Sequence, residues 1–340
     1  MKAAKALPPP TWEHAARHRD NKVAADHYHH WKEDVDLMAE LGLKVYRMGF
    51  AWSRIMPDAT CHPPTPRGWA FYDRLIDYLL EKGIEPLVTL YHFECPQALV
   101  DAFGGWLDRK MIDAYLKYAE VCFTHFKGRV KRWVTVNEQL IATAAGIMNG
   151  NFEQDKQKNL QNIYQMSYHV SLAEHQAISL LRQIDPEAQI GRCVLSRWSI
   201  PSPVAARMFW LRERRRLMEF YLLDLSVRGE YPPYVASYLK SHGLYPQTLP
   251  EDAAVLKAST PDFIGINYYF SIAPKPRRVP STTTSRPSGC RTPSTSVIIP
   301  TCAKPSGWTR ASTRWACILG CARSIIATVC HDRHRKRHGL

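Results

Sequence analysis

The 340-residue sequence lacks any apolar run long enough to cross a bilayer, and its first ten residues hold two lysines and three prolines instead of a hydrophobic segment. A membrane-spanning helix needs about 20 consecutive apolar residues, and a secretory signal needs an apolar stretch of about 7 to 15. These absences argue against a membrane protein and against secretion. We therefore expect a cytoplasmic protein without a membrane partner.

The pattern of a disulfide framework is also missing, although cysteine itself is present. The nine cysteines are an odd number, and five of them lie within residues 271–340. An odd number without a secretory signal is typical of reduced thiols. Cys317 and Cys321 lie near several histidines, but their spacing fits no standard zinc pattern. The sequence therefore predicts no metal site and no other cofactor.

An even distribution of charge is lacking as well. The formal net charge is +14, which alone is typical of proteins that bind nucleic acids. Residues 271–340 hold 13 Lys and Arg against a single acid, Asp332, whereas residues 1–270 hold 32 basic and 30 acidic residues. The basic residues of the tail are not interleaved with stacking aromatics, so we expect no nucleic-acid partner.

Between residues 26 and 270, helical patterns alternate with short apolar runs. The expected helices cover 26–41, 69–82, 109–126, 163–184 and 204–227, and the expected strands cover 43–50, 84–91, 130–137, 188–195 and 262–269. This alternation favours right-handed crossovers and a parallel sheet covered on both faces. A doubly wound sheet and a (β/α)8 TIM barrel both fit, although no Gly-rich phosphate loop follows the first strand.

Polar residues gather where the expected strands end. His92 ends the second strand, Asn137 and Glu138 end the third, and Asn267 and Tyr269 end the fifth. In a (β/α)8 barrel these ends form the face that carries the active site. The clustering therefore favours the barrel over the doubly wound sheet.

The chain divides into three parts on this interpretation. Residues 26–270 form an α/β domain, an incomplete (β/α)8 TIM barrel with about five of its eight strands. Residues 1–25 form an irregular N-terminal segment. Residues 271–340, rich in Ser, Thr, Pro, Arg and Cys, form an irregular basic tail.

Five motifs in order resemble glycoside hydrolase family 1. They are Tyr28–Asp34 (YHHWKED), Tyr46–Arg54 (YRMGFAWSR), Leu87–His92 (LVTLYH), Trp133–Glu138 (WVTVNE) and Phe263–Tyr269 (FIGINYY). The resemblance covers most of the chain. It implies a TIM barrel and a retaining hydrolase of β-glycosides.

Retaining glycosidases need two carboxyl groups, one to protonate the leaving oxygen and one to attack the anomeric carbon. The resemblance implies that Glu138 is the acid, and later the base, of this reaction. It also places five residues around the sugar or the nucleophile: Asn137 at the 2-hydroxyl, His92 at the 3-hydroxyl side, Arg47 beside the nucleophile, Tyr269 in a hydrogen bond to it, and Asn267 in the same pocket.

Less specific interpretations of single residues exist. A glutamate at a strand end can be a solvated loop carboxylate, His92 can be a structural histidine, and Tyr269 can simply pack in its strand. Trp52, Trp106 and Trp133 are expected in the core or at the barrel rim.

The substrate class follows from the residues after His92. Phe93-Glu94 and Cys95-Pro96 stand where plain β-glucosidases tend to have Trp-Asp. This resembles the branch that hydrolyses 6-phospho-β-glucosides, sugars phosphorylated during uptake. The alternatives are a plain β-glucosidase or β-galactosidase, and a catalytically inactive sugar-binding protein.

The terminal segments depart from the family pattern. Residues 1–21 lack the Gln-x-Glu-Gly context of the family's first strand, and residues 271–340 contain no glutamate, so the nucleophile motif Thr-Glu-Asn-Gly is absent. The codons of His331–Arg337, read one base later, can spell Met-Ile-Val-Thr-Glu-Asn-Gly. We interpret the tail as a barrel end translated out of frame and expect an inactive chain. A gene without Thr-Glu-Asn-Gly in any other frame there would refute this interpretation.

Overall fold

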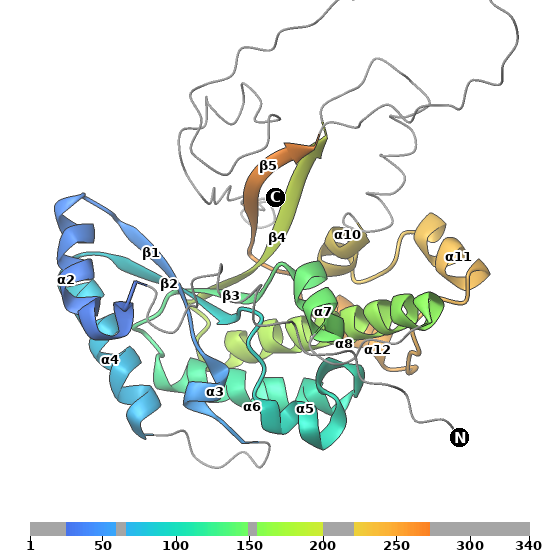
Figure 1. Cartoon of the computed structure of the whole chain (residues 1–340), viewed down its shortest axis with the longest axis horizontal. Helices are drawn as coiled ribbons and strands as arrows, with labels where there is room; N and C mark the ends of the chain where they lie inside the picture. The colour runs from blue at the N-terminus through green and yellow to red at the C-terminus, as the bar shows by residue number, and fades with distance from the viewer. Residues whose placement is uncertain (1–24, 59–65, 149–154, 200–220, 273–340) are drawn as a thin grey trace, which may run out of the picture.

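The computed structural model describes residues 25–58, 66–148, 155–199 and 221–272 (Figure 1). Within them, five strands form one sheet in the order β1-β2-β3-β4-β5, and every neighbouring pair is parallel. The strands are β1 (Val45–Gly49), β2 (Glu85–Tyr91), β3 (Arg132–Asn137), β4 (Gln189–Ser199) and β5 (Phe263–Ile272).

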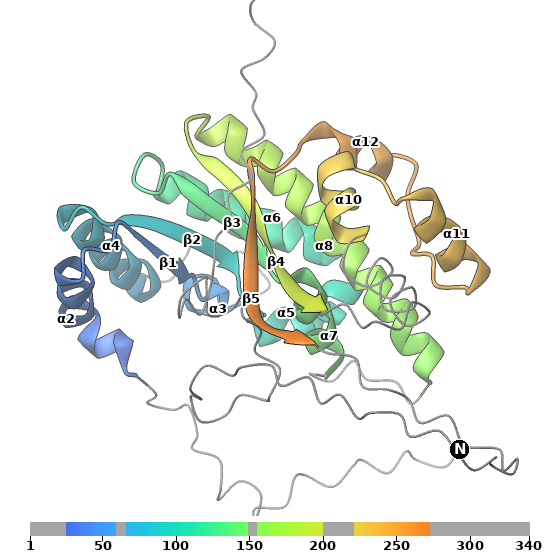
Figure 2. The same cartoon turned by 90° about the horizontal axis from the view of Figure 1, so that it is seen from above.

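Helices connect successive strands and cover the outside of the sheet. They are α2 (His27–Glu40), α3 (Trp52–Ile55), α4 (Pro66–Glu81), α5 (Gln97–Phe103), the 3-10 turn η1 (Gly105–Leu107), α6 (Lys110–His125), α7 (Gln139–Met148), α8 (Lys156–Ile184), α10 (Tyr221–Arg228), α11 (Pro233–Ser241) and α12 (Asp252–Ala258). Figure 2 shows α4, α6 and α8 along one face of the curved sheet, with α10, α11 and α12 grouped beyond β4. This arrangement is part of a (β/α)8 barrel and confirms the predicted incomplete barrel.

All five expected strands are present, and β4 and β5 extend beyond their predicted ends. Helix α8 begins seven residues before the expected start at Ile163, because Asp155 caps it: its Oδ1 accepts a hydrogen bond from the backbone N–H of Gln157 at 2.7 Å. The helix expected over 204–227 is seen from residue 221 onward as α10, and its earlier part lies outside the described residues. The segment 1–24 and the tail from residue 273 also lie outside them.

The core fills the space between the sheet and the helices. Strands β2 and β3 are buried along almost their whole length, as expected of strands covered on both faces. Trp52 stacks on Tyr118 with ring centroids 4.8 Å apart, and Trp106 and Trp133 are also buried. Of the two positions expected for these tryptophans, the core or the barrel rim, the structure shows them buried in the core. No helix in the described ranges combines the length and apolar character needed to cross a membrane.

Gly191 allows β4 to lie close against β5. A Cβ atom at this position would lie 2.5 Å from both the ring and the carbonyl oxygen of Phe263, its partner in the parallel register. Real Cβ atoms do not approach so closely, so a larger residue would push the two strands apart.

Candidate active site

Arg47 on β1 forms hydrogen bonds with residues of three other strands of the sheet. Its Nε donates to Thr89 Oγ1 on β2 at 3.1 Å, its Nη2 donates to Asn137 Oδ1 at the end of β3 at 2.7 Å, and its Nη1 donates to Asn267 Oδ1 on β5 at 3.1 Å. All three acceptors are neutral. The guanidinium is therefore held firmly, but none of these bonds balances its charge.

The contact between Arg47 and Asn267 also shows how strongly the sheet curls. Strands β1 and β5 are four strand spacings apart in the sheet order, which would separate them by about 19 Å in a flat sheet. The two side chains and a 3.1 Å hydrogen bond cannot span that distance. The sheet is therefore curved like a barrel wall, and these residues lie on its concave side.

Glu138 receives its hydrogen bond from Asn267. The amide Nδ2 of Asn267 donates to Glu138 Oε1 at 2.5 Å and lies 3.1 Å from Asn137 Oδ1. Arg47 has only donors, so the Asn267 amide must turn its oxygen toward Arg47 and its nitrogen toward Glu138. The three residues joined by the Asn267 amide are almost fully buried: Asn137 is 1%, Glu138 6% and Asn267 2% exposed.

We call Arg47, Asn137, Glu138 and Asn267 the inner cluster. Two of its polar atoms, Glu138 Oε2 and Asn137 Nδ2, form no hydrogen bond with the described residues. They are an acceptor and a donor that a ligand can use.

The backbone of Glu138 is unusual. Its φ is +44°, in the left-handed region that a residue with a long side chain rarely adopts. Its N–H donates to the carbonyl of Cys193 on β4 at 2.8 Å, and α7 begins at the next residue. Burial raises the pKa of the Cys193 thiol, which donates to Asn267 Oδ1 at 3.0 Å. Backbone strain of this kind persists only where surrounding contacts enforce it.

His92 lies at the same end of the sheet but outside the hydrogen-bonded cluster. It follows β2 directly, and its Cβ would lie 3.7 Å from a Cβ placed on Gly49 at the end of β1. Partial burial, and then the nearby charge of Arg47, lower the pKa of His92. The imidazole is therefore predominantly neutral near pH 7 and can accept or donate a hydrogen bond.

Asn267 and Tyr269 were expected to end the fifth strand, but β5 continues to Ile272, and the side chain of Tyr269 is outside the described part of the structure. The structure thus brings together Arg47, Asn137, Glu138 and Asn267, with His92 beside them at the carboxyl end of β2. The roles that the resemblance gave to these residues stay predictions.

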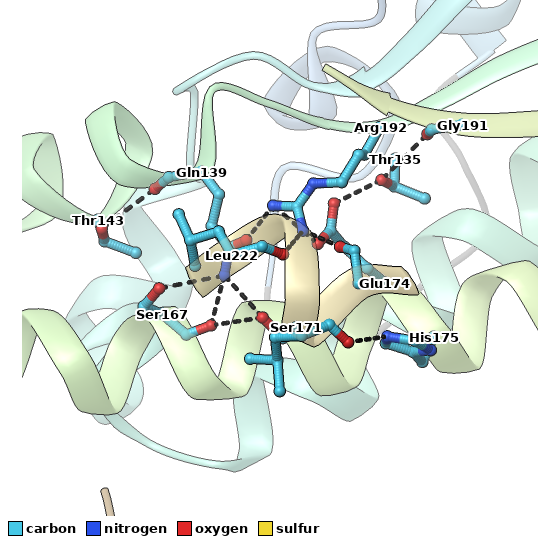
Figure 3. A network of polar contacts seen from close by, with 12 residues as sticks. Thr135, Gln139, Thr143, Ser167, Ser171, Glu174, His175, Gly191, Arg192 and Leu222 are labelled. Atoms are coloured by element: carbon cyan, nitrogen blue, oxygen red, sulfur yellow. Dashed lines mark hydrogen bonds and ion pairs between the residues drawn. The ribbon is translucent and has the colours of Figure 1, made fainter. Parts of the chain in front are cut away.

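A second buried polar group lies between the strands and helix α8, and sequence reasoning missed it (Figure 3). We call it the outer cluster; it consists of Thr135, Gln139, Ser167, Ser171, Glu174 and Arg192. Arg192 and Glu174 are each 2% exposed, and their Nη2 and Oε2 atoms are 3.4 Å apart. A charged residue inside the apolar run 188–195 was the signal that could have found this group.

Within the described ranges, no group of three or more His, Cys, Asp or Glu side chains is arranged to hold a metal ion. Cys95, Cys122 and Cys193 form no disulfide bonds.

The sequence model of glycosyl hydrolase family 1 matches residues 10–336. Among curated proteins, the chain is 40% identical over 256 residues to "Beta-glucosidase 42" of Arabidopsis thaliana, covering 73% of this chain and 51% of that protein. It is 38% identical over 251 residues to a "6-phospho-beta-glucosidase" of Dickeya chrysanthemi, covering 73% and 53%. The chain therefore spans about half the length of the curated relatives it matches.

Solved structures of family 1 enzymes are also similar to this chain. A family 1 β-glucosidase from Thermotoga maritima is 31% identical, with a TM-score of 0.64, over 72% of this chain and 54% of that one. The same enzyme in complex with castanospermine gives a TM-score of 0.66 at 30% identity, over 77% and 59%. The family match, the curled parallel sheet and the inner cluster on its concave side agree. The chain belongs to glycosyl hydrolase family 1.

Proposed function

We propose that this chain carries the acid/base half of a retaining β-glucosidase site, with Glu138 as the acid/base residue. The observation that carries the proposal is the hydrogen bond from Asn267 Nδ2 to Glu138 Oε1. It fixes one carboxyl oxygen and leaves the other, Oε2, without a hydrogen bond to the described residues. Oε2 is then the oxygen that carries the proton to the leaving group.

The remaining residues of the inner cluster orient the sugar. The oxygen of Asn137 is occupied by Arg47 and Asn267, so its amide nitrogen is the atom that meets a sugar hydroxyl. His92, at the neighbouring strand end, offers a second polar contact. Hydrogen bonds to the 2-hydroxyl strengthen as positive charge develops at the anomeric carbon, which is why a donor or acceptor fixed there accelerates the reaction.

We propose 6-phospho-β-glucosides as the substrate class. The Phe93-Glu94-Cys95-Pro96 sequence after His92 supports it, and several similar curated proteins are named as phospho-β-glucosidases. A plain β-glucoside is the alternative, since similar proteins also include enzymes named as β-glucosidases.

The 340-residue chain itself is proposed to have no measurable turnover. A retaining mechanism needs a second carboxyl group about 5 to 5.5 Å from the first. Glu138 is the one carboxylate in the hydrogen bonds of the inner cluster, and residues 271–340 hold no glutamate. A second candidate function is sugar binding without catalysis, which the unused polar atoms of Asn137 and Glu138 favour.

The test measures hydrolysis and binding on the same protein. We expect no nitrophenol release above background from p-nitrophenyl β-D-glucoside or its 6-phosphate, in the chain or in Glu138→Gln. A complete 6-phospho-β-glucosidase serves as the positive control. Hydrolysis that disappears in Glu138→Gln would overturn the absence of turnover while supporting the role of Glu138.

Titration with glucose 6-phosphate and with glucose then separates the substrate classes. Tighter binding of the phosphorylated sugar is expected. Equal or tighter binding of glucose would contradict the 6-phospho specificity, and no binding of either sugar would remove the sugar-binding alternative.

A further inference from the structure

Gln139 directly follows Glu138, yet its side chain points to the opposite side of the sheet and is 1% exposed (Figure 3). Its amide Nε2 donates to the carbonyl of Ser167 on α8 at 2.5 Å and lies 2.8 Å from Ser171 Oγ. Its Oε1 accepts a hydrogen bond from Arg192 Nη2 on β4. Both ends of this amide are therefore held, one by a helix and the other by a strand.

Arg192 extends the outer cluster to a third element. Its Nη1 donates to the carbonyl of Leu222 on α10 at 3.0 Å and to Ser226 Oγ, while Nη2 faces Glu174. The guanidinium thus fixes Gln139 relative to both the sheet and α10. A lysine could not make these contacts at once, because it lacks the planar fork.

Glu174 links the same group back to β3. Its Oε1 accepts a hydrogen bond from Thr135 Oγ1 at 2.7 Å, and Thr135 lies three residues before Glu138. Residues on both sides of Glu138 along the chain are therefore bound to one buried ion pair. Glu138 also lines a cavity of about 20 Å³ together with Gln139 and Arg192, which shows how near the two clusters are.

Stability alone does not account for this ion pair. Buried ion pairs are often no more stabilising than apolar residues of the same volume. Here Arg192 Nε and Glu174 Oε2 have no hydrogen-bond partner within the described residues, which adds to the cost of burying them. A geometric role explains why such a group lies directly behind a strained residue.

We propose that Gln139, Arg192 and Glu174 are positioning residues for Glu138. The Glu138 N–H is bound to Cys193, and the Gln139 side chain is drawn outward by Arg192 and Ser167. With both neighbours fixed, the left-handed backbone at Glu138 is enforced and its carboxyl group must point inward to Asn267. This inference rests on the proposed role of Glu138 as acid/base.

The experiment observes the Glu138 carboxyl carbon by NMR in protein labelled with ¹³Cδ-glutamate, without any sugar. The resonance is assigned by its loss in Glu138→Gln. In Gln139→Leu, which leaves the Arg192–Glu174 pair intact, we expect the Glu138 resonance to move to the position of a solvated glutamate. The double variant Arg192→Met/Glu174→Gln removes both charges together and is expected to move it in the same direction.

The matched control is the ion pair between Arg109 and Asp252, where Nη1 and Oδ2 are 3.1 Å apart and Asp252 is 1% exposed. Arg109→Met/Asp252→Asn removes a less buried arginine–carboxylate pair that does not contact Gln139, and the Glu138 resonance should stay in place. A Glu138 resonance unchanged in both outer-cluster variants would overturn the proposal. If it moves as expected but the chain binds no sugar, the proposed function fails and the positioning role stands.

Discussion

The inner and outer clusters are joined at the Glu138-Gln139 peptide, and each is centred on an arginine. In the outer cluster the arginine faces a carboxylate, and the side chain of Gln139 is bonded at both ends. In the inner cluster the hydrogen bonds of Arg47 go to neutral atoms, and two polar atoms are unused by the described residues. Both clusters contain polar atoms without a hydrogen bond to the described residues, but in the outer cluster these atoms belong to an ion pair, whereas in the inner cluster they belong to Asn137 and Glu138 and are available to a ligand.

The largest expected effect lies in the outer cluster. Arg192→Met leaves Glu174 as a buried charge without a counter-ion and should lower the free energy of unfolding by about 3–5 kcal/mol. Arg192→Met/Glu174→Gln should be much closer to the parent chain, because no charge is stranded. Urea unfolding measures both. A single variant no less stable than the double would contradict the charge balance assigned to this cluster.

A smaller effect is expected in the inner cluster. Asn267→Ala removes one partner each from Arg47, Asn137 and Glu138, and should cost about 1–3 kcal/mol in the same experiment. Cys193→Ser keeps a donor toward Asn267 Oδ1 and serves as the control, with a loss below about 1 kcal/mol. Equal losses in the two variants would mean that the Asn267 amide is not the centre of the cluster.

The smallest effect is a pH dependence beside the outer cluster. Burial lowers the pKa of His175, against the opposing influence of hydrogen bonds to the carbonyls of Ser259 and Leu225. A folded pKa below the ordinary value of about 6.5 means that the unfolded chain takes up the proton first. The stability contributed by neutral His175 is thus complete above about pH 6.5 and is lost as the pH falls through the folded pKa, by at most about 1.4 kcal/mol per pH unit.

Unfolding measured at pH 7.5 and at pH 5.5 tests this contribution, and His175→Gln should reduce the difference between the two. Glu174 works in the other direction, because burial raises its pKa and a raised carboxyl pKa adds stability as the pH falls. The pKa of His92 is lowered like that of His175, so its contribution to stability also falls as the pH falls. His92 is more exposed, so its contribution to the pH dependence is smaller. An unaltered pH dependence in His175→Gln would exclude His175 as the source.

The inner cluster could be named residue by residue from the sequence because each of its members lies in one of the family motifs, although only Asn137 and Glu138 stand at a strand end. The outer cluster could not, since Gln139, Glu174 and Arg192 come from three separate elements and belong to no motif. Arg192 interrupts an apolar strand, which marks it as unusual. Its partners depend on how α8 and α10 pack on the sheet.

The sequence by itself determined the parallel sheet, the buried tryptophans and the place of Asn137 and Glu138 at the end of a strand, because these follow from local patterns and short motifs. Only the tertiary structure decided that Arg47 reaches Asn267, because that contact needs the curl of the whole sheet. It also decided that Asn267 turns its amide nitrogen toward Glu138, because the donors of Arg47 and Cys193 occupy the oxygen. Hydrogen-bond directions of this kind arise from contacts distant in sequence, which no local pattern records.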